Sequence, residues 1–155
     1  MRLSQLGSYE MLIVNALGFR LQPLTLDEVV ETVVFLAFGE QVDGPAGDLR
    51  RRVRGVACYL ADICLRDWGC VNVPPFELGC AIFEHAVSSL DANVVLPATV
   101  SSSVDVEQLD LSKAVLSSAV RDYFASGPRQ LLVQRYESLV DHRYLYGIAD
   151  SSQPQ

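Results

Sequence analysis

Apolar side chains recur every three or four positions along several stretches of the chain, and glycine and proline separate these stretches. This spacing is typical of amphipathic helices. The clearest stretch predicts a helix from Asp48 to Trp68, with Trp68 at the end of its apolar stripe and Gly69 after it. Thr25 and Glu28 form a capping-box pattern that predicts the start of another helix, which would run to about Phe38. The many β-branched residues of that stretch also suit a strand, but the capping box and the length favour a buried helix.

The remaining punctuation predicts four more helices and one long loop. Gly79 and Cys80 are small enough to let a neighbouring helix approach closely, and we expect Phe83, Leu60 and Leu116 in the core. Asp91 to Gln108 is polar and β-branched, which predicts a mobile surface loop. The further helices are expected at Leu3–Leu17, Pro75–Leu90, Asp110–Ala125 and Pro128–Val140. The predicted fold class is therefore all-α: a single globular domain of about five helices plus a preceding N-terminal helix.

Composition narrows the class of protein. The chain has 155 residues, of which 50% are hydrophobic and 20% charged, as expected for one folded domain rather than a disordered segment. No apolar run approaches the ~20 residues that span a bilayer, so we expect no membrane partner. The formal net charge of -7 argues against binding nucleic acid, whose phosphates would be repelled.

The four cysteines are Cys58, Cys64, Cys70 and Cys80, and no pair has the two-residue spacing of a zinc knuckle or a redox motif. A metal site can be drawn from Cys64, Cys70, Cys80 and His85. The interpretation that we favour is buried, reduced thiols in the nucleus or cytoplasm. We therefore expect no metal and no cofactor.

No constellation of catalytic residues stands out. A Gly-rich phosphate loop, an HExxH motif and a nucleophile elbow are all absent from the sequence. The carboxylate pairs Asp27/Glu28 and Asp105/Glu107 are better explained by a helix start and a solvated loop. A cysteine and a histidine could act as nucleophile and base, but nothing in their spacing favours it. We expect a protein that is not an enzyme.

Basic residues cluster once, at Arg50-Arg51-Arg52-Val53-Arg54, in an otherwise acidic chain. One interpretation is a solvated helix face with ion pairs to Asp48 or Glu40. The other is a docking patch for an acidic or phosphorylated segment, which guanidinium groups bind bidentately. The candidate docking residues are Arg50, Arg51 and Arg54, and the first and last of these lie one helical turn apart.

Four further stretches of the chain are informative by their order and spacing. They are Tyr9-Glu10 with Leu17-Gly18-Phe19 and Pro23; Phe35-Leu36; Tyr59 to Trp68 with Pro74-Pro75 and Leu78 to Ala81; and Arg135-Tyr136-Glu137-Ser138 with His142-Arg143-Tyr144 and Gly147-Ile148-Ala149. Together they resemble the cyclins, and specifically the second of the two helical cyclin boxes, closest to the mitotic A- and B-type. The resemblance covers most of the chain. Two departures are the Gly44-Pro45-Ala46-Gly47 segment and the loop at Asp91–Gln108.

The resemblance implies a regulatory, non-catalytic subunit or fragment. It would bind a cyclin-dependent Ser/Thr kinase in cell-cycle control and help to dock partner proteins. It divides the chain into residues 1–22, matching the end of a first cyclin box, a C-terminal box at 23–149 and a polar tail at 150–155. An alternative is a cyclin-fold interaction module in transcription, unconnected to a kinase.

Overall fold

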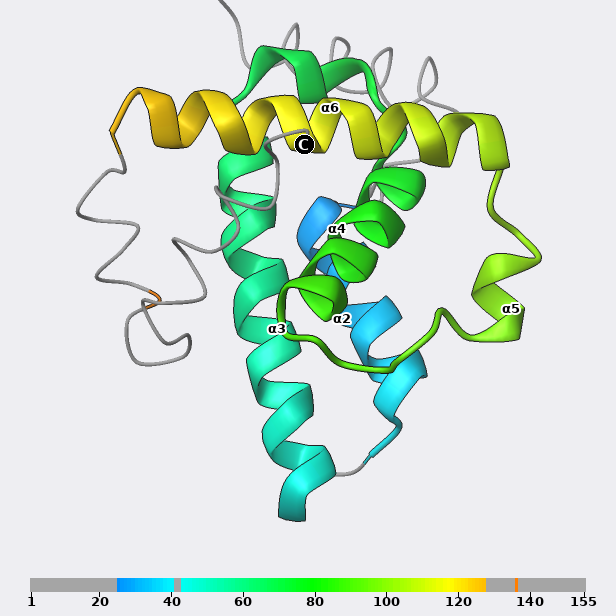
Figure 1. The fold of residues 1–155 in the computed structure, drawn as a ribbon. Coiled ribbons are helices and arrows are strands. Elements are labelled where there is room, and N and C mark those ends of the chain that lie inside the picture. Colours follow the sequence, from blue (N-terminus) through cyan, green and yellow to red (C-terminus); the bar gives the residue numbers. More distant parts are fainter. Residues whose placement is uncertain (1–24, 41–42, 128–135, 137–155) are drawn as a thin grey trace, which may run out of the picture.

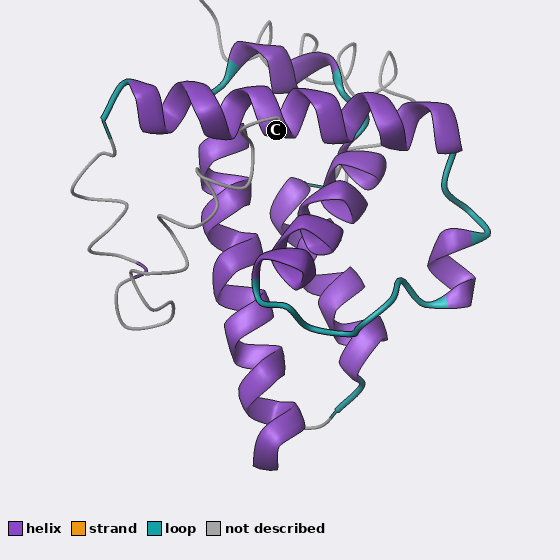
Figure 2. Ribbon diagram, viewed as in Figure 1, coloured by secondary structure: helices purple, strands orange, loops and turns teal. Residues whose placement is uncertain are grey.

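The computed structural model describes residues 25–40, 43–127 and 136. Within these ranges every regular element is helical and there is no strand, as Figure 2 shows. The all-α prediction is confirmed. The α-helices are α2 (Leu26–Phe38), α3 (Gly44–Cys64), α4 (Pro75–Ser89), α5 (Ala98–Ser101) and α6 (Val106–Ala125), and the 3-10 helix η1 (Trp68–Asn72) follows α3.

The start of α2 has the predicted capping box. The backbone N–H of Glu28 donates to the Thr25 hydroxyl at 3.3 Å, and the Thr25 N–H donates to the Glu28 carboxylate at 3.0 Å. Two of the N–H groups that a helix start leaves unpaired are thereby satisfied. The helix ends at Gly39, whose φ of 67° suits glycine and whose N–H reaches the Phe35 carbonyl at 2.7 Å. The strand alternative for this stretch is thereby excluded.

The centre of the fold is α4, which packs against α2, α3 and α6. In Figure 1, α6 lies across α3 and α4, and α2 lies behind α4. All six residues from Leu78 to Phe83 are buried, so α4 has neighbours on nearly every side. Leu60 and Phe83 are 0% exposed and Leu116 is 1% exposed, which confirms the predicted core positions.

Close approach of α2 and α4 depends on Gly79, as the small residue there suggested. A Cβ atom added to Gly79 would lie 2.4 Å from Cγ1 of Val29. No side chain other than hydrogen fits this crossing without a shift of one helix.

The third helix differs from its predicted range, Asp48–Trp68, at both ends. It begins at Gly44 with Pro45 in its first turn, where a missing N–H costs nothing. It ends at Cys64 because Asp67 caps a new helix: its carboxylate accepts the Gly69 N–H at 2.7 Å, and Trp68 begins η1. The prediction that Trp68 lies on the buried stripe of this helix is therefore wrong, because its side chain is 86% exposed.

The predicted loop at Asp91–Gln108 and the predicted start of the next helix at Asp110 are both corrected. Asp105 accepts the N–H groups of Glu107 and Gln108 at 3.0 and 3.2 Å, so α6 begins at Val106. The loop also contains the single turn α5, which buries Val100. Asp105 is thus an N-cap and not a solvated loop residue.

The expected helices at Leu3–Leu17 and Pro128–Val140 and the polar tail lie outside the described residues, except for Tyr136. This side chain is buried, and its hydroxyl donates to the Asp62 carboxylate at 2.7 Å. Across the ranges that the structure describes, no helix combines the length and the apolar character needed to cross a bilayer.

Candidate functional site

The predicted docking residues Arg50 and Arg54 lie on the side of α3 that faces α2. The Arg50 guanidinium stands over the Phe35 ring, 5.8 Å from its centroid, in a cation–π arrangement. One turn later, Arg54 reaches Glu31 on α2. The structure therefore brings the two residues together in one row, as their spacing indicated.

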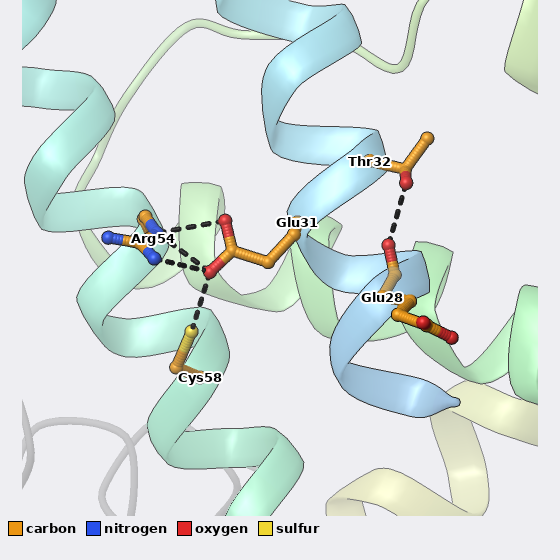
Figure 3. A network of polar contacts seen from close by, with 5 residues as sticks. All are labelled: Glu28, Glu31, Thr32, Arg54 and Cys58. Carbon is orange, nitrogen blue, oxygen red and sulfur yellow. Dashed lines mark hydrogen bonds and ion pairs between the residues drawn. The ribbon is translucent and has the colours of Figure 1, made fainter. Parts of the chain in front are cut away.

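The strongest polar contact in this row is the pair of Arg54 and Glu31. Arg54 Nε donates to the two carboxylate oxygens at 2.7 and 2.9 Å, and its terminal nitrogen lies 2.7 Å from the nearer oxygen. Figure 3 shows this fork together with Cys58, whose sulfur lies 3.8 Å from the same carboxylate. Hydrogen bonding to Glu31 raises the pKa of Arg54, so the guanidinium stays charged. Both side chains remain about half exposed, at 56% and 43%, so a partner can reach them.

Arg51 forms an ion pair with Asp48 within the first turns of α3. This is one of the two ion pairs expected from the solvated-face interpretation. The ion pair of Arg54 with Glu31 was not predicted, because Glu31 is 23 residues away in the sequence and belongs to another helix. An acidic partner would have to compete with Asp48 and Glu31 for these guanidinium groups.

A hollow of about 390 Å³ adjoins the arginine row between α2 and α3. Its carboxylates are Asp27, Glu31 and Asp62, and its guanidinium groups are Arg51 and Arg54. Gly55, Cys58 and Tyr136 complete the lining. Opposite charges side by side suit recognition of a polar segment more than binding of a strongly charged ion.

The thiol in this hollow is poorly suited to nucleophilic chemistry. Burial raises the pKa of Cys58 to about 11, and the nearby Glu31 carboxylate acts in the same direction. Burial likewise raises the pKa of Cys80 to about 11. At neutral pH both thiols are protonated, and the thiol is far less nucleophilic than the thiolate.

A second surface, which the sequence did not predict, follows the end of α3. Leu65, Trp68 and Val71 are 61%, 86% and 65% exposed. They are three residues apart, which is the period of a 3-10 helix, so Trp68 and Val71 share one face of η1 and Leu65 precedes them at the same spacing. We call residues 65–71 the Trp68 segment. The signal that could have located it is Asp67, a good N-cap residue directly before the tryptophan.

The Trp68 segment borders a mainly apolar hollow of about 350 Å³. Its lining comes from the start of α2, the end of α3, η1 and the start of α4. The residues are Thr25, Leu26, Cys64, Leu65, Cys70, Val71, Val73, Pro75 and Leu78.

The cysteines do not gather with His85 into the metal site that the sequence allowed. No group of three or more His, Cys, Asp or Glu side chains is placed to hold a metal ion within the described ranges. Cys64, Cys70 and Cys80 are buried, and Cys58 is half-buried; all four thiols are free.

Comparison with known proteins identifies no relative: no family model, no curated protein and no solved structure matches the chain. The resemblance to a cyclin box therefore stays a prediction from the sequence.

Proposed function

We propose that the chain is a non-catalytic regulatory subunit, or part of one, that binds a cyclin-dependent Ser/Thr kinase through a cyclin-like helical domain. The observation that carries this proposal is the exposure of Leu65, Trp68 and Val71 on one short segment. Adjacent exposed apolar side chains mark interaction sites, and tryptophan is enriched among residues that dominate binding energy. The identity of the partner comes from the sequence resemblance to the second cyclin box.

A binding function also agrees with the chemistry of the side chains. Cys58 and Cys80 hold their protons at neutral pH, and Arg54 in the polar hollow is paired with Glu31. The arginine row would serve as a secondary contact for acidic or phosphorylated segments. Such segments could replace Asp48 and Glu31 as partners of Arg51 and Arg54. On this proposal the protein works in the nucleus or the cytoplasm.

Binding to a purified cyclin-dependent kinase subunit, measured by surface plasmon resonance, tests the proposal. Leu65→Ala and Trp68→Ala should each weaken binding by about tenfold or more, since buried interface anchors commonly contribute above ~1.4 kcal/mol. Leu111→Ala is the matched control, because Leu111 on α6 is also exposed, at 51%. Equal losses in the Leu65 and Leu111 variants would exclude the Trp68 segment as the contact.

The same experiment addresses the alternative, a cyclin-fold module in transcription. If the folded chain shows no binding to cyclin-dependent kinases at tens of micromolar, the kinase proposal is wrong. Retained binding to a transcription-factor or polymerase partner, sensitive to Trp68→Ala, would then support the alternative.

A further inference from the structure

The Trp68 segment is supported on one side and open on the other. Its 3-10 helix η1 packs along α6, as Figure 1 shows, and Gly69 lies at this contact: a Cβ atom added there would stand 3.9 Å from Cγ1 of Val115. On the open side the Trp68 side chain is 86% exposed. A large apolar side chain on a supported helix is already positioned for contact with another molecule, so little ordering is needed on binding.

This surface has a projection and a hollow side by side. Leu65 and Val71 line the apolar hollow of about 350 Å³. Trp68 lies between them in the sequence but does not belong to the lining, so its side chain leaves the hollow of its own chain open. Pockets for whole ligands measure roughly 300–1,000 Å³, so this hollow has room for one indole ring. The chain therefore carries both halves of a knob-and-hole contact on one surface.

The chemistry of the hollow also suits an indole. Its walls are mainly aliphatic, and among the described residues that line it Thr25 alone has a side-chain oxygen. A buried indole N–H needs one acceptor. The Thr25 hydroxyl accepts the Glu28 N–H at 3.3 Å and donates to the Glu28 carboxylate at 3.0 Å. Because a hydroxyl oxygen has two lone pairs, one of them is left for the indole.

The charges beside Trp68 permit contact between two copies. Arg66 is exposed and Asp67 is half-buried, and they directly precede the tryptophan. In a two-fold dimer the same patch of each copy meets the other, so a basic and an acidic side chain next to each other can pair reciprocally. Charges of one sign would instead repel the second copy. This surface is locally balanced, although the whole chain has a formal net charge of -7.

We propose that the Trp68 segment is a self-association surface, through which two copies of the chain form a two-fold dimer with Trp68 of each copy in the hollow of the other. Each indole buries about 150–250 Å². The contact is therefore small beside the ~1,200–2,000 Å² of stable interfaces, and we expect a reversible dimer with a dissociation constant on the order of 10 µM. This inference stands whether or not the segment binds a kinase, and a kinase that contacts Trp68 would have to displace the second copy.

Sedimentation velocity of the full chain tests the proposal. Between about 1 and 200 µM we expect the monomer to give way to a dimer. Trp68→Ala should raise the dissociation constant at least about tenfold, as loss of a central aromatic anchor does. Leu111→Ala is the control, because Leu111 on α6 is exposed but distant from the hollow in the sequence and absent from its lining. A chain that stays monomeric throughout, or a dimer that Trp68→Ala leaves intact, would overturn the proposal.

Mixing two variants tests the reciprocal arrangement. Trp68→Ala removes the projection and keeps the hollow, whereas Val71→Glu places a carboxylate at the hollow and keeps the projection. Each variant alone should dimerise weakly, and circular dichroism checks that both are folded. An equal mixture regains one of the two contacts, so its dissociation constant should lie midway, on a logarithmic scale, between those of the unaltered chain and the variants. A mixture no tighter than its components would exclude the insertion.

Fluorescence identifies the residue that is covered, because Trp68 is the single tryptophan of the chain. As the concentration rises through the dissociation constant, its emission should move to shorter wavelength and acrylamide should quench it less. Equal protection at every concentration would mean that residues of the same chain cover Trp68, and equal quenching at every concentration would mean that nothing does. Either result would overturn the proposal.

Discussion

Replacing Gly79 by alanine adds one methyl group where α2 and α4 cross, and we expect it to destabilise the fold. The new Cβ would stand 2.4 Å from Cγ1 and 3.1 Å from Cβ of Val29, whereas nonbonded carbon atoms prefer about 3.5–4.0 Å. Rotating the valine side chain moves Cγ1 but leaves Cβ in place, and valine has one strongly preferred rotamer in a helix. The two helices must therefore separate.

Two opposing free energies decide the result. Alanine is a better helix former than glycine by roughly 0.5–1 kcal/mol. Overpacking a well-filled core costs about 1–3 kcal/mol. Since Val29 is 3% exposed and Gly79 is buried in the central helix, the second effect should win. We expect Gly79→Ala to lower the free energy of unfolding by about 1–2 kcal/mol, where most domains have about 5–15 kcal/mol in total.

Unfolding in guanidinium chloride, followed by circular dichroism, measures this loss. Ser118 on α6 is exposed and provides the control: Ser118→Ala should be more stable than Ser118→Gly, which isolates the helix-propensity difference. In a Val29→Ala background the 2.4 Å contact is removed and only the 3.1 Å contact with Cβ remains, so Gly79→Ala should cost less stability there than in the unaltered chain. If Gly79→Ala stabilises the unaltered chain, the close approach of α2 and α4 that underlies this reasoning is wrong.

Three further outcomes are expected. Burial lowers the pKa of His85, whose Nε2 has no hydrogen-bond partner among the described residues, so the unfolded chain binds a proton at this side chain more readily than the folded chain. The contribution of neutral His85 to stability is therefore present above about pH 6.5 and is lost as the pH falls toward the lowered native pKa, by at most ~1.4 kcal/mol per pH unit. His85→Gln should reduce this slope in unfolding measured as a function of pH. Arg50→Ala/Arg54→Ala should change the unfolding free energy by no more than ~1–2 kcal/mol, since both contacts are exposed. The double variant should weaken binding of acidic or phosphorylated peptides more at 50 mM than at 500 mM salt, and binding losses that are independent of salt would contradict the electrostatic role. Residues 1–155 should bind a cyclin-dependent kinase without strongly stimulating phosphorylation, because the resemblance implies that a first cyclin box supplies most of the activating interface, and strong stimulation by the chain alone would refute this.

Local signals in the sequence were sufficient for much of the fold. The capping box of Thr25 and Glu28 and the Pro-Pro start of α4 are both complete within a few residues, so they predicted helix starts correctly. Phe83 lies in mid-helix on an apolar stripe at helical spacing, which predicted its burial. These features depend on backbone hydrogen bonds and helical spacing that neighbouring residues decide.

Two local signals were misjudged because they competed with others. The serines and β-branched residues around Asp105 predict a solvated loop, yet Asp105 caps α6. The helical spacing of Trp68 from the apolar residues of α3 predicts that it lies on the buried stripe of that helix. The carboxylate of Asp67 caps η1, so the α-helical spacing of α3 does not continue to Trp68. A side chain–backbone hydrogen bond of this kind outweighs the periodicity of the apolar residues.

The contacts of the candidate sites depend on tertiary structure and could not be predicted from local patterns. Glu31 pairs with Arg54 across two helices, and nothing near Arg54 in the sequence indicates its partner. Tyr136 and Asp62 are 74 residues apart and are joined by one hydrogen bond. The packing of α2 and α4 around Gly79 decides which residues of α2 face α3, and hence whether Glu31 is within reach.

The short segment after α3 has two faces, and their separation explains how exposed apolar residues are compatible with a stable core. Cys64, Cys70 and Val73 are at most 7% exposed and close the core beneath the segment. Leu65 and Val71 directly follow Cys64 and Cys70, and Trp68 lies three residues from each of them, so these three side chains point outward. Loss of an outward side chain should therefore leave the free energy of unfolding nearly unchanged while altering binding. A change on the inward row acts on the outward row through the backbone that both share. The partner contact and the closure of the core are thus separable by mutation, although one short segment holds both.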